Sequence, residues 1–293
     1  MSARSLVRPL VAAGLAAAAA AGVMRARRPA AARWPRLVRL NHAGRPVSLL
    51  EGPAAGAGLL AAAACAPGTA ARTAALTAVG TAGLLGAVDD FAESGTSKGL
   101  RGHLSALVRG QVTTGAVKVI GIPIAAVVAG RLVRTDARTC RFADAVLAGG
   151  VVAGTANLLN LLDLRPGRAL KAGLVMLAGQ TALETLPGAR DALTAAGPQA
   201  RHVTDSGVLR GGLLGTSAVL LRDDLAGATM LGDAGANALG AAIGMRSALT
   251  ASRPRLVAEL AVLAALTLAS ERVSFTRVIE STPGLRRLDA LGR

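Results

Sequence analysis

Long apolar runs fill most of this chain, and they contain almost no aromatic residues. Of the 293 residues 52% are hydrophobic, yet the sequence holds three Phe, one Trp and no Tyr. A soluble core of this size would normally contain more aromatic volume, whereas helices that pack closely in lipid through small residues need less of it. We therefore expect an all-α fold, a polytopic transmembrane helical bundle that forms a single integral domain over residues 1–293.

Nine of the apolar runs are candidate transmembrane spans. The first resembles a signal peptide, but no clean cleavage site follows it and more apolar runs do, so we interpret it as a span. Several runs are shorter than the roughly 20 residues that a ~30 Å hydrocarbon core requires, and their ends are therefore approximate. The predicted spans are 5–24, 52–67, 70–88, 107–130, 142–161, 169–186, 207–221, 235–250 and 256–270. We interpret residues 188–206 as a polar linker or a short surface helix.

The chain is strongly basic, with a net charge of +16. Its Arg residues lie mainly between the apolar runs, where they set topology and meet anionic lipid headgroups. The Arg-rich block at 25–45 is expected in the cytoplasm by the positive-inside rule, which leaves the N-terminus outside. The predicted location is the plasma membrane, crossed several times, with residues 271–293 as a basic cytoplasmic tail. No nucleic-acid partner is expected, because the chain has no recognition motif and no aromatic stacking platform.

The two cysteines, Cys65 and Cys140, show no metal-binding spacing. The predicted topology places both near the outer face. A disulfide between them is conceivable there, but we favour two free thiols.

Two adjacent carboxylates, Asp89 and Asp90, end the third apolar run. Desolvating a carboxylate is costly unless a cation or water is at hand. Neighbouring carboxylates suit Mg²⁺, which binds protein through one or two carboxylates and takes its other oxygens from water and phosphate. Lys98 and Arg101, which follow in the next loop, would hold phosphate oxygens. The alternative is an ordinary helix end at a membrane surface.

Asn157, Asn160 and Asp163 are spaced by three residues, which places them along one face of a helix. Asn in an apolar helix needs a polar partner. The alternative to a binding role is hydrogen bonding between helices. The turn that follows presents further basic residues at the same surface, namely Arg165, Arg168 and Lys171.

A third polar group is Asp233, which is flanked by Gly and precedes a helix. Such a site permits close backbone approach and offers free N–H groups to an anion. The alternative is that Asp233 is the N-cap of that helix. Lys118 lies inside a predicted span, where its amine would reach a headgroup or meet a lipid phosphate.

Together these motifs resemble the polyprenyl-phosphate N-acetylhexosamine-1-phosphate transferase family (glycosyltransferase family 4). The matching pieces are GAVDDF…KGLRGHL…G at 86–110, NLLNLLD at 157–163 and MLGDAGANALG at 230–240. The loop at 40–54 occupies the place of that family's first cytoplasmic motif. The resemblance spans about residues 35–250.

The resemblance implies Mg²⁺-dependent transfer of a sugar-1-phosphate from a UDP-sugar to polyprenyl phosphate, in cell-envelope glycan synthesis. The products would be a lipid-diphospho-sugar and UMP, and the partners would include membrane lipid, with a homodimer as a candidate assembly. The metal ligands would be Asp233 and Asp90. The catalytic residues would be Asp89, Asp90 and Asp163. The substrate-binding residues would be Asn157, Asn160, Lys98, Arg101, Lys118, Arg165 and Arg168.

The chain departs from that family in three places. The Asn-rich motif of the family usually continues with DG and a second Asp, whereas LRPGR follows Asp163 here. The family typically has a His-containing loop near the C-terminus, and none of the three His residues lies there. The family's pentapeptide transferases have ten spans, not nine. We therefore expect a divergent member, with a non-catalytic relative that binds polyprenyl phosphate and partners envelope enzymes as the main alternative. A transporter is a third reading, which no paired inverted repeat supports.

Overall fold

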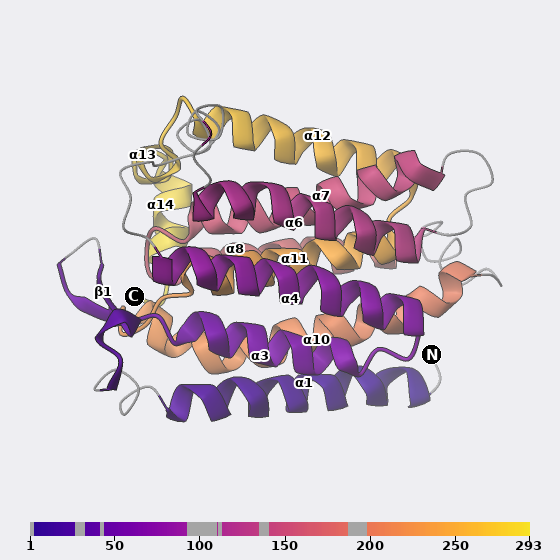
Figure 1. Ribbon diagram of the computed structural model, residues 1–293, viewed down its shortest axis with the longest axis horizontal. Coiled ribbons are helices and arrows are strands. Elements are labelled where there is room, and N and C mark those ends of the chain that lie inside the picture. Colours follow the sequence, from indigo (N-terminus) through magenta and orange to yellow (C-terminus); the bar gives the residue numbers. More distant parts are fainter. Residues whose placement is uncertain are drawn as a thin grey trace.

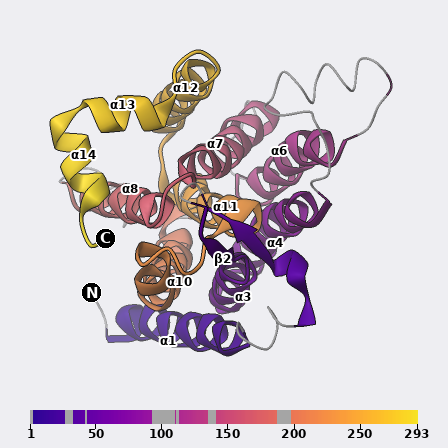
Figure 2. The ribbon, with the colours of Figure 1, turned by 90° about the vertical axis from the view of Figure 1, so that its left-hand side faces the viewer.

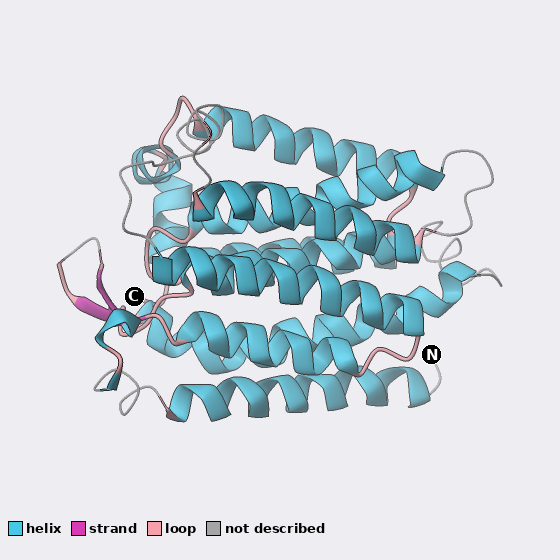
Figure 3. Ribbon diagram, viewed as in Figure 1, coloured by secondary structure: helices cyan, strands magenta, loops and turns pink. Residues whose placement is uncertain are grey.

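The computed structural model describes residues 3–26, 33–41, 44–92, 110, 113–134, 141–186 and 198–293. Over these residues the fold is helical, as expected, apart from one short β-hairpin (Figure 3). Four helices are long and apolar enough to cross a membrane. These four are Val7–Arg25, Thr69–Phe91, Thr114–Val133 and Phe142–Leu162. Membrane crossing itself, by these four and by the other five predicted spans, stays a prediction.

Each of the nine predicted spans coincides with a long helix, and Figure 1 shows these helices running side by side along the molecule. Of the segment predicted as a polar linker or a short surface helix, residues 188–197 lie outside the described residues, and residues 198–206 are helical but form the start of a 28-residue helix rather than a short separate one. The helices are α1 (Ala3–Arg25), α3 (Glu51–Ala64), α4 (Thr69–Ala92), α6 (Thr114–Val133), α7 (Arg141–Leu162), α8 (Arg168–Thr185), α10 (Pro198–Leu225), α11 (Gly232–Thr250) and α12 (Arg253–Ser270).

Helix α11 lies at the centre of the bundle, with α3, α4, α7, α8 and α10 around it (Figure 2). It is buried on all sides, because it consists largely of Ala and Gly and its neighbours approach closely. A Cβ added at Gly240 or Gly244 would come within 2.4 Å and 2.6 Å of the α7 backbone. Small residues at this seam therefore replace the aromatic volume that the sequence lacks.

Short elements cover one end of the bundle, on the left in Figure 1. They are η1 (Pro35–Leu37), β1 (Val38–Leu40), β2 (Pro46–Ser48), α13 (Phe275–Ser281) and α14 (Pro283–Ala290). The two strands pair antiparallel, with Arg39 opposite Val47. We call this the site end, because the last turns of α4, α7 and α10 and the first turns of α3, α6, α8 and α11 meet there. Cys65, at the opposite end of α3, has a free thiol, and Cys140 lies outside the described residues.

Candidate functional site

Asp90, in the last turn of α4, caps the N-terminus of the central helix α11. Its Oδ1 accepts a hydrogen bond from the N–H of Asp233 (3.1 Å) and its Oδ2 accepts one from Ala234 (2.9 Å). Gly232 has φ of 59°, and a Cβ there would lie 2.9 Å from Asp90 Oδ2. Only glycine meets both demands. The free N–H groups predicted at this helix end thus bind an anion, but that anion is a carboxylate of the same chain.

Asp233 itself lies in the first turn of α11, so the alternative reading of it as the N-cap was wrong. Its backbone is held from two sides: Asn237 Nδ2 donates to its carbonyl at 2.7 Å, and α4 packs against it. A Cβ at Gly86 would come within 2.3 Å of the Asp233 carbonyl oxygen. Glycine at position 86 therefore lets the carboxylates of α4 reach the start of α11.

Lys118, in the first half of α6, lies between the carboxylates of Asp89 and Asp233. Its Nζ is 2.5 Å from Asp89 Oδ2 and also contacts Asp233 Oδ2. Thr114 donates a hydrogen bond to the other Asp89 oxygen at 2.8 Å. We call Asp89, Asp90, Lys118 and Asp233 the lysine cluster. In the free protein this lysine meets carboxylates rather than the headgroup or lipid phosphate that the sequence suggested for it.

Three further carboxylates, Glu51, Asp163 and Asp224, are buried nearby, with 0%, 8% and 1% of their surface exposed. We call them the buried carboxylates. Both oxygens of Glu51 and the Oδ2 atoms of Asp163 and Asp224 have no hydrogen-bond partner among the described residues. Burial, reinforced by the charge of Asp224, raises the pKa of Glu51 and of Asp163 well above the ordinary range. Burial raises the pKa of Asp224 to about 6.

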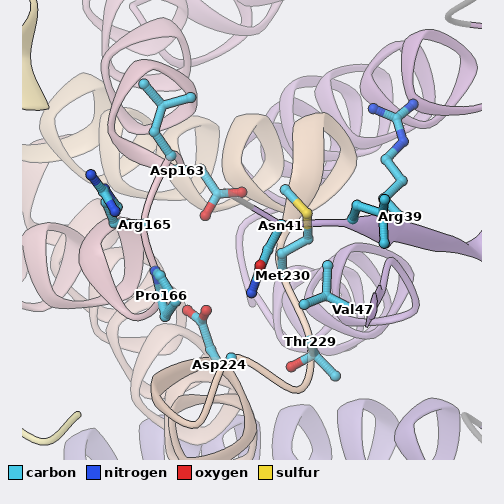
Figure 4. Close-up of a pocket in the computed structure, with 12 residues that line it drawn as sticks. Arg39, Asn41, Val47, Asp163, Arg165, Pro166, Asp224, Thr229 and Met230 are labelled. Carbon is cyan, nitrogen blue, oxygen red and sulfur yellow. The ribbon is translucent and has the colours of Figure 1, made fainter. Parts of the chain in front are cut away.

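Asp163 and Asp224 face a cavity of about 240 Å³, and Figure 4 shows their carboxylates pointing into it from the ends of α7 and α10. Asn41, Arg165 and Thr229 are among the other polar residues that line it. Arg39 also lines the cavity, but its guanidinium extends away from these carboxylates and donates to the Asp90 carbonyl. The cavity is therefore lined by both hydrogen-bond donors and acceptors, with two buried carboxylates among the acceptors.

Sequence reasoning missed Glu51 and Asp224 as site residues. A signal was present, because Asp223 and Asp224 form an acidic pair at the end of an apolar run, as Asp89 and Asp90 do. Glu51 likewise stands at the start of a run of Ala and Gly, where a carboxylate is costly to desolvate.

Asn157, Asn160 and Arg165, which were predicted to bind substrate, have different surroundings in the structure. Asn157 Nδ2 donates to Thr267 Oγ1 at 3.1 Å and so joins α7 to α12, which is the interhelical role considered as its alternative. Asn160 is half-buried in the last turn of α7, next to Asp163 in the chain. Arg165 lines the cavity and pairs with Glu280 at 2.7 Å.

Arg168 is buried and binds the C-terminal segment. Its Nε and Nη2 donate to the two oxygens of Asp289 at 2.8 Å and 3.1 Å, and its Nη1 donates to Thr276 at 2.9 Å. The Nε–Nη2 edge of this guanidinium is thus occupied by a carboxylate of the same chain. Lys98 and Arg101 lie outside the described residues.

The lysine cluster also allows a test of the residues against Mg²⁺. Asp89 Oδ2 and Asp233 Oδ2 converge on one cation, the Lys118 amine, so two carboxylates from different helices already share a cation position. In the described part of the chain, no group of three or more His, Cys, Asp or Glu residues could hold a metal ion. Two carboxylates completed by water and phosphate oxygens suit Mg²⁺, whereas a structural zinc site needs four protein ligands. Asp90 was predicted as a metal ligand, but both of its oxygens already accept backbone N–H groups of α11, so that Asp89 rather than Asp90 shares the cation with Asp233.

No protein-family model matches this chain, and no curated protein matches it.

Proposed function

We propose that this chain is a divergent sugar-1-phosphate transferase of the plasma membrane. It would move a sugar-1-phosphate from a UDP-sugar to polyprenyl phosphate in cell-envelope glycan synthesis, with Mg²⁺ as cofactor. The observation that carries the proposal is the shared cation position between Asp89 and Asp233 beside a cavity lined by Asp163, Asp224 and Arg165. Both features lie at one end of a bundle in which four helices are apolar enough to cross a membrane.

The chemistry explains why a cation belongs at this position. Both substrates are anions, and the site itself is rich in carboxylates, so a divalent ion would neutralise the phosphate oxygens that approach Asp89 and Asp233. A phosphate oxygen of the acceptor attacks the β-phosphorus of the donor, a new P–O bond forms, and the bond to UMP breaks with its electron pair leaving on UMP. The acceptor phosphate has a second pKa near ~6 and is mostly ionised already, so no carboxylate is required as a general base.

Each residue then has a separate task. Asp89 and Asp233 hold the ion, and Asp90 fixes Asp233 through the first N–H groups of α11. Lys118, displaced from between the two carboxylates, is assigned to an oxygen of the transferring phosphate. Asn160 and Asp163 are assigned to the nucleotide sugar in the cavity, with Arg165 at its rim.

A second cavity, of about 280 Å³ and mostly apolar, suits the chain of the acceptor lipid. It lies between α7 and α8 on one side and α13 and α14 on the other. Leu158, Leu162 and Met176 form part of its wall, and Lys171 stands among its few polar residues. An isoprenoid chain in this cavity would hold its phosphate at the site end of the bundle.

Radiolabel transfer with the purified protein tests the proposal. Protein in detergent with polyprenyl phosphate and Mg²⁺ would be offered a panel of UDP-sugars, and UMP and lipid-linked product would be counted. We expect product from one donor, and its loss with EDTA, in Asp233→Asn and in Asp90→Asn. Wild-type rates in both variants would overturn the assignment.

One observation favours the non-catalytic alternative: the lysine cluster and Arg168 are satisfied within the chain, as in a protein that only binds. Complementation of a gene deletion separates the two functions. A chain carrying Asp89→Asn, Asp90→Asn and Asp233→Asn together should fail to complement if it is an enzyme. Full complementation by the triple variant would support a binding role.

A further inference from the structure

Residues 271–293 fold into a pair of short helices, α13 and α14, which we call the C-terminal hairpin. Figures 1 and 2 show it beyond the end of α12, against the start of α8 at the site end. The four helices that are apolar enough to cross a membrane each begin or end at this level. The hairpin therefore lies where the headgroup layer of a bilayer would meet the bundle.

The inner face of the hairpin is fixed to the turn that carries Asp163. Arg168 binds the carboxylate of Asp289, and Lys171 donates to the carbonyls of Leu288 and Leu291, each at 3.2 Å. Arg293 returns the contact by donating to the carbonyl of Pro166 at 2.8 Å. Burial raises the pKa of Asp289, but hydrogen bonds and charge from Arg168 outweigh it and hold the pKa below the ordinary value. The carboxylate is thus ionised and attached at neutral pH.

The outer face of the hairpin forms no ion pair with the part of the chain that the structure describes. Four Arg side chains are exposed there, and none forms an ion pair with another described residue; they are Arg272, Arg277, Arg286 and Arg287. Three large apolar residues are also exposed on the hairpin, namely Val273, Val278 and Leu291, whereas Leu285 and Leu288 line the cavity on its inner side. Basic and apolar side chains that alternate on one short amphipathic segment are typical of helices that lie in a membrane interface.

We propose that the C-terminal hairpin is an interfacial membrane-binding element that docks on anionic lipid headgroups. Charge complementarity identifies the occupant, because unpaired Arg side chains near a bilayer are attracted to anionic lipid and hardly to zwitterionic lipid. The exposed Val273, Val278 and Leu291 enter the acyl boundary beneath the headgroups. The inner face of the same two helices contacts the turn that carries Asp163. Lipid contact and the geometry of the cavity therefore depend on the same element. This inference does not depend on the transferase activity.

Depth-dependent fluorescence quenching tests it in the full-length protein. The only tryptophan, Trp34, would be replaced by Phe, and a single probe would be introduced as Leu291→Trp or, independently, Val278→Trp. Each protein would be reconstituted into phosphatidylcholine bilayers or into bilayers that also contain phosphatidylglycerol, with brominated acyl chains as quencher. We expect at least twofold stronger quenching in the anionic bilayers at both probes.

Charge variants supply the control. Arg286→Gln with Arg287→Gln should return quenching in anionic bilayers to the level of neutral ones. Arg72→Gln with Arg131→Gln removes the same charge at the opposite end of the bundle and should leave quenching unchanged. Thermal unfolding in detergent checks that all variants fold. Equal quenching in both lipids, or a solvent-exposed probe in both, would overturn the proposal, the latter in favour of a protein partner for this face.

Discussion

The lysine cluster and the buried carboxylates lie at the same end of the bundle, yet they differ in how their charges are balanced. In the lysine cluster the carboxylates of Asp89, Asp90 and Asp233 each meet a cation or a backbone N–H. Among the buried carboxylates, both oxygens of Glu51 and one each of Asp163 and Asp224 have no partner in the described residues. Buried polar groups in proteins are normally hydrogen-bonded, so the second group is incomplete by itself.

The difference arises from where the nearby cations are directed. Lys118 projects from α6 between two carboxylates, whereas Arg165, Arg168 and Lys171 turn to the C-terminal hairpin. The first group is therefore held in its working geometry before any ligand binds. The second group is complementary to a ligand that brings hydrogen-bond donors or positive charge. The lysine cluster is thus preorganised, whereas the buried carboxylates keep oxygens that can accept hydrogen bonds from a ligand.

The largest expected effect comes from removing the internal cation with Lys118→Met. Two partly buried carboxylates would then face each other, and breaking such a pair typically costs about 3–5 kcal/mol. We expect the melting temperature in EDTA to fall strongly and Mg²⁺ to recover much of the loss, because the ion would take the vacated position. Thermal unfolding in detergent with EDTA or Mg²⁺ measures both effects.

Lys118→Arg is the matched control, since it keeps the charge and should lose less stability. A methionine variant that unfolds like the wild type in EDTA would contradict the view that this lysine balances the cluster. A variant that unfolds early but gains nothing from Mg²⁺ would contradict the shared cation position.

The second prediction concerns Asp224→Asn, which we expect to stabilise the free protein. The pKa of Asp224 is about 6 in the folded state against 3.8 for the ordinary group. The folded state thus holds a proton that the unfolded state has lost, and stability decreases as pH rises from the ordinary pKa through about 6. An amide carries no charge, so it removes this penalty. The raised pKa of Asp224 corresponds to at most about 3 kcal/mol of stability, and relaxation around the charge makes the penalty smaller. We therefore expect Asp224→Asn to gain about 1–2 kcal/mol at pH 8.

Unfolding of both proteins between pH 3 and pH 8 checks the sign, because the gain should vanish below the ordinary pKa of 3.8. Asp223→Asn removes the same charge from the neighbouring, half-buried position and should change stability less. A loss of stability in Asp224→Asn at pH 8 would show that the carboxylate is already balanced.

The positions of the nine long helices could be predicted from the sequence, because each coincides with a continuous run of mostly apolar residues bounded by polar or charged ones. The meeting of Asp89, Asp90 and Asp233 at one end was also predictable, since each stands at the end of such a run. The start of α10 was not, because residues 198–206 are polar and the run of apolar residues begins only afterwards.

The pairing of individual side chains could not be read from the sequence. Lys118 lies 115 residues from Asp233, and Arg168 lies 121 residues from Asp289. Local patterns show that a charged residue needs a partner, but they do not show which of several partners the fold brings close. For Arg168 an anionic substrate and an acidic tail residue are equally good by charge, and only the packing of the hairpin decides for the tail.

The smallest expected effect on global unfolding, and the sharpest test of this comparison, comes from Asp289→Asn. It weakens the paired hydrogen bonds to Arg168, and charged hydrogen bonds of this kind typically contribute about 1.5–3 kcal/mol, most of it felt as local release of the hairpin rather than global unfolding. We expect faster amide hydrogen exchange over residues 271–293 and little change in α11. Glu280→Gln is the control, because its partner Arg165 and its own side chain are more exposed. Once released, Arg168 could turn to the buried carboxylates, and the stability gained by Asp224→Asn should then be smaller in the Asp289→Asn background. Equal gains in both backgrounds would mean that the Arg168–Asp289 pair and the buried carboxylates are electrostatically independent.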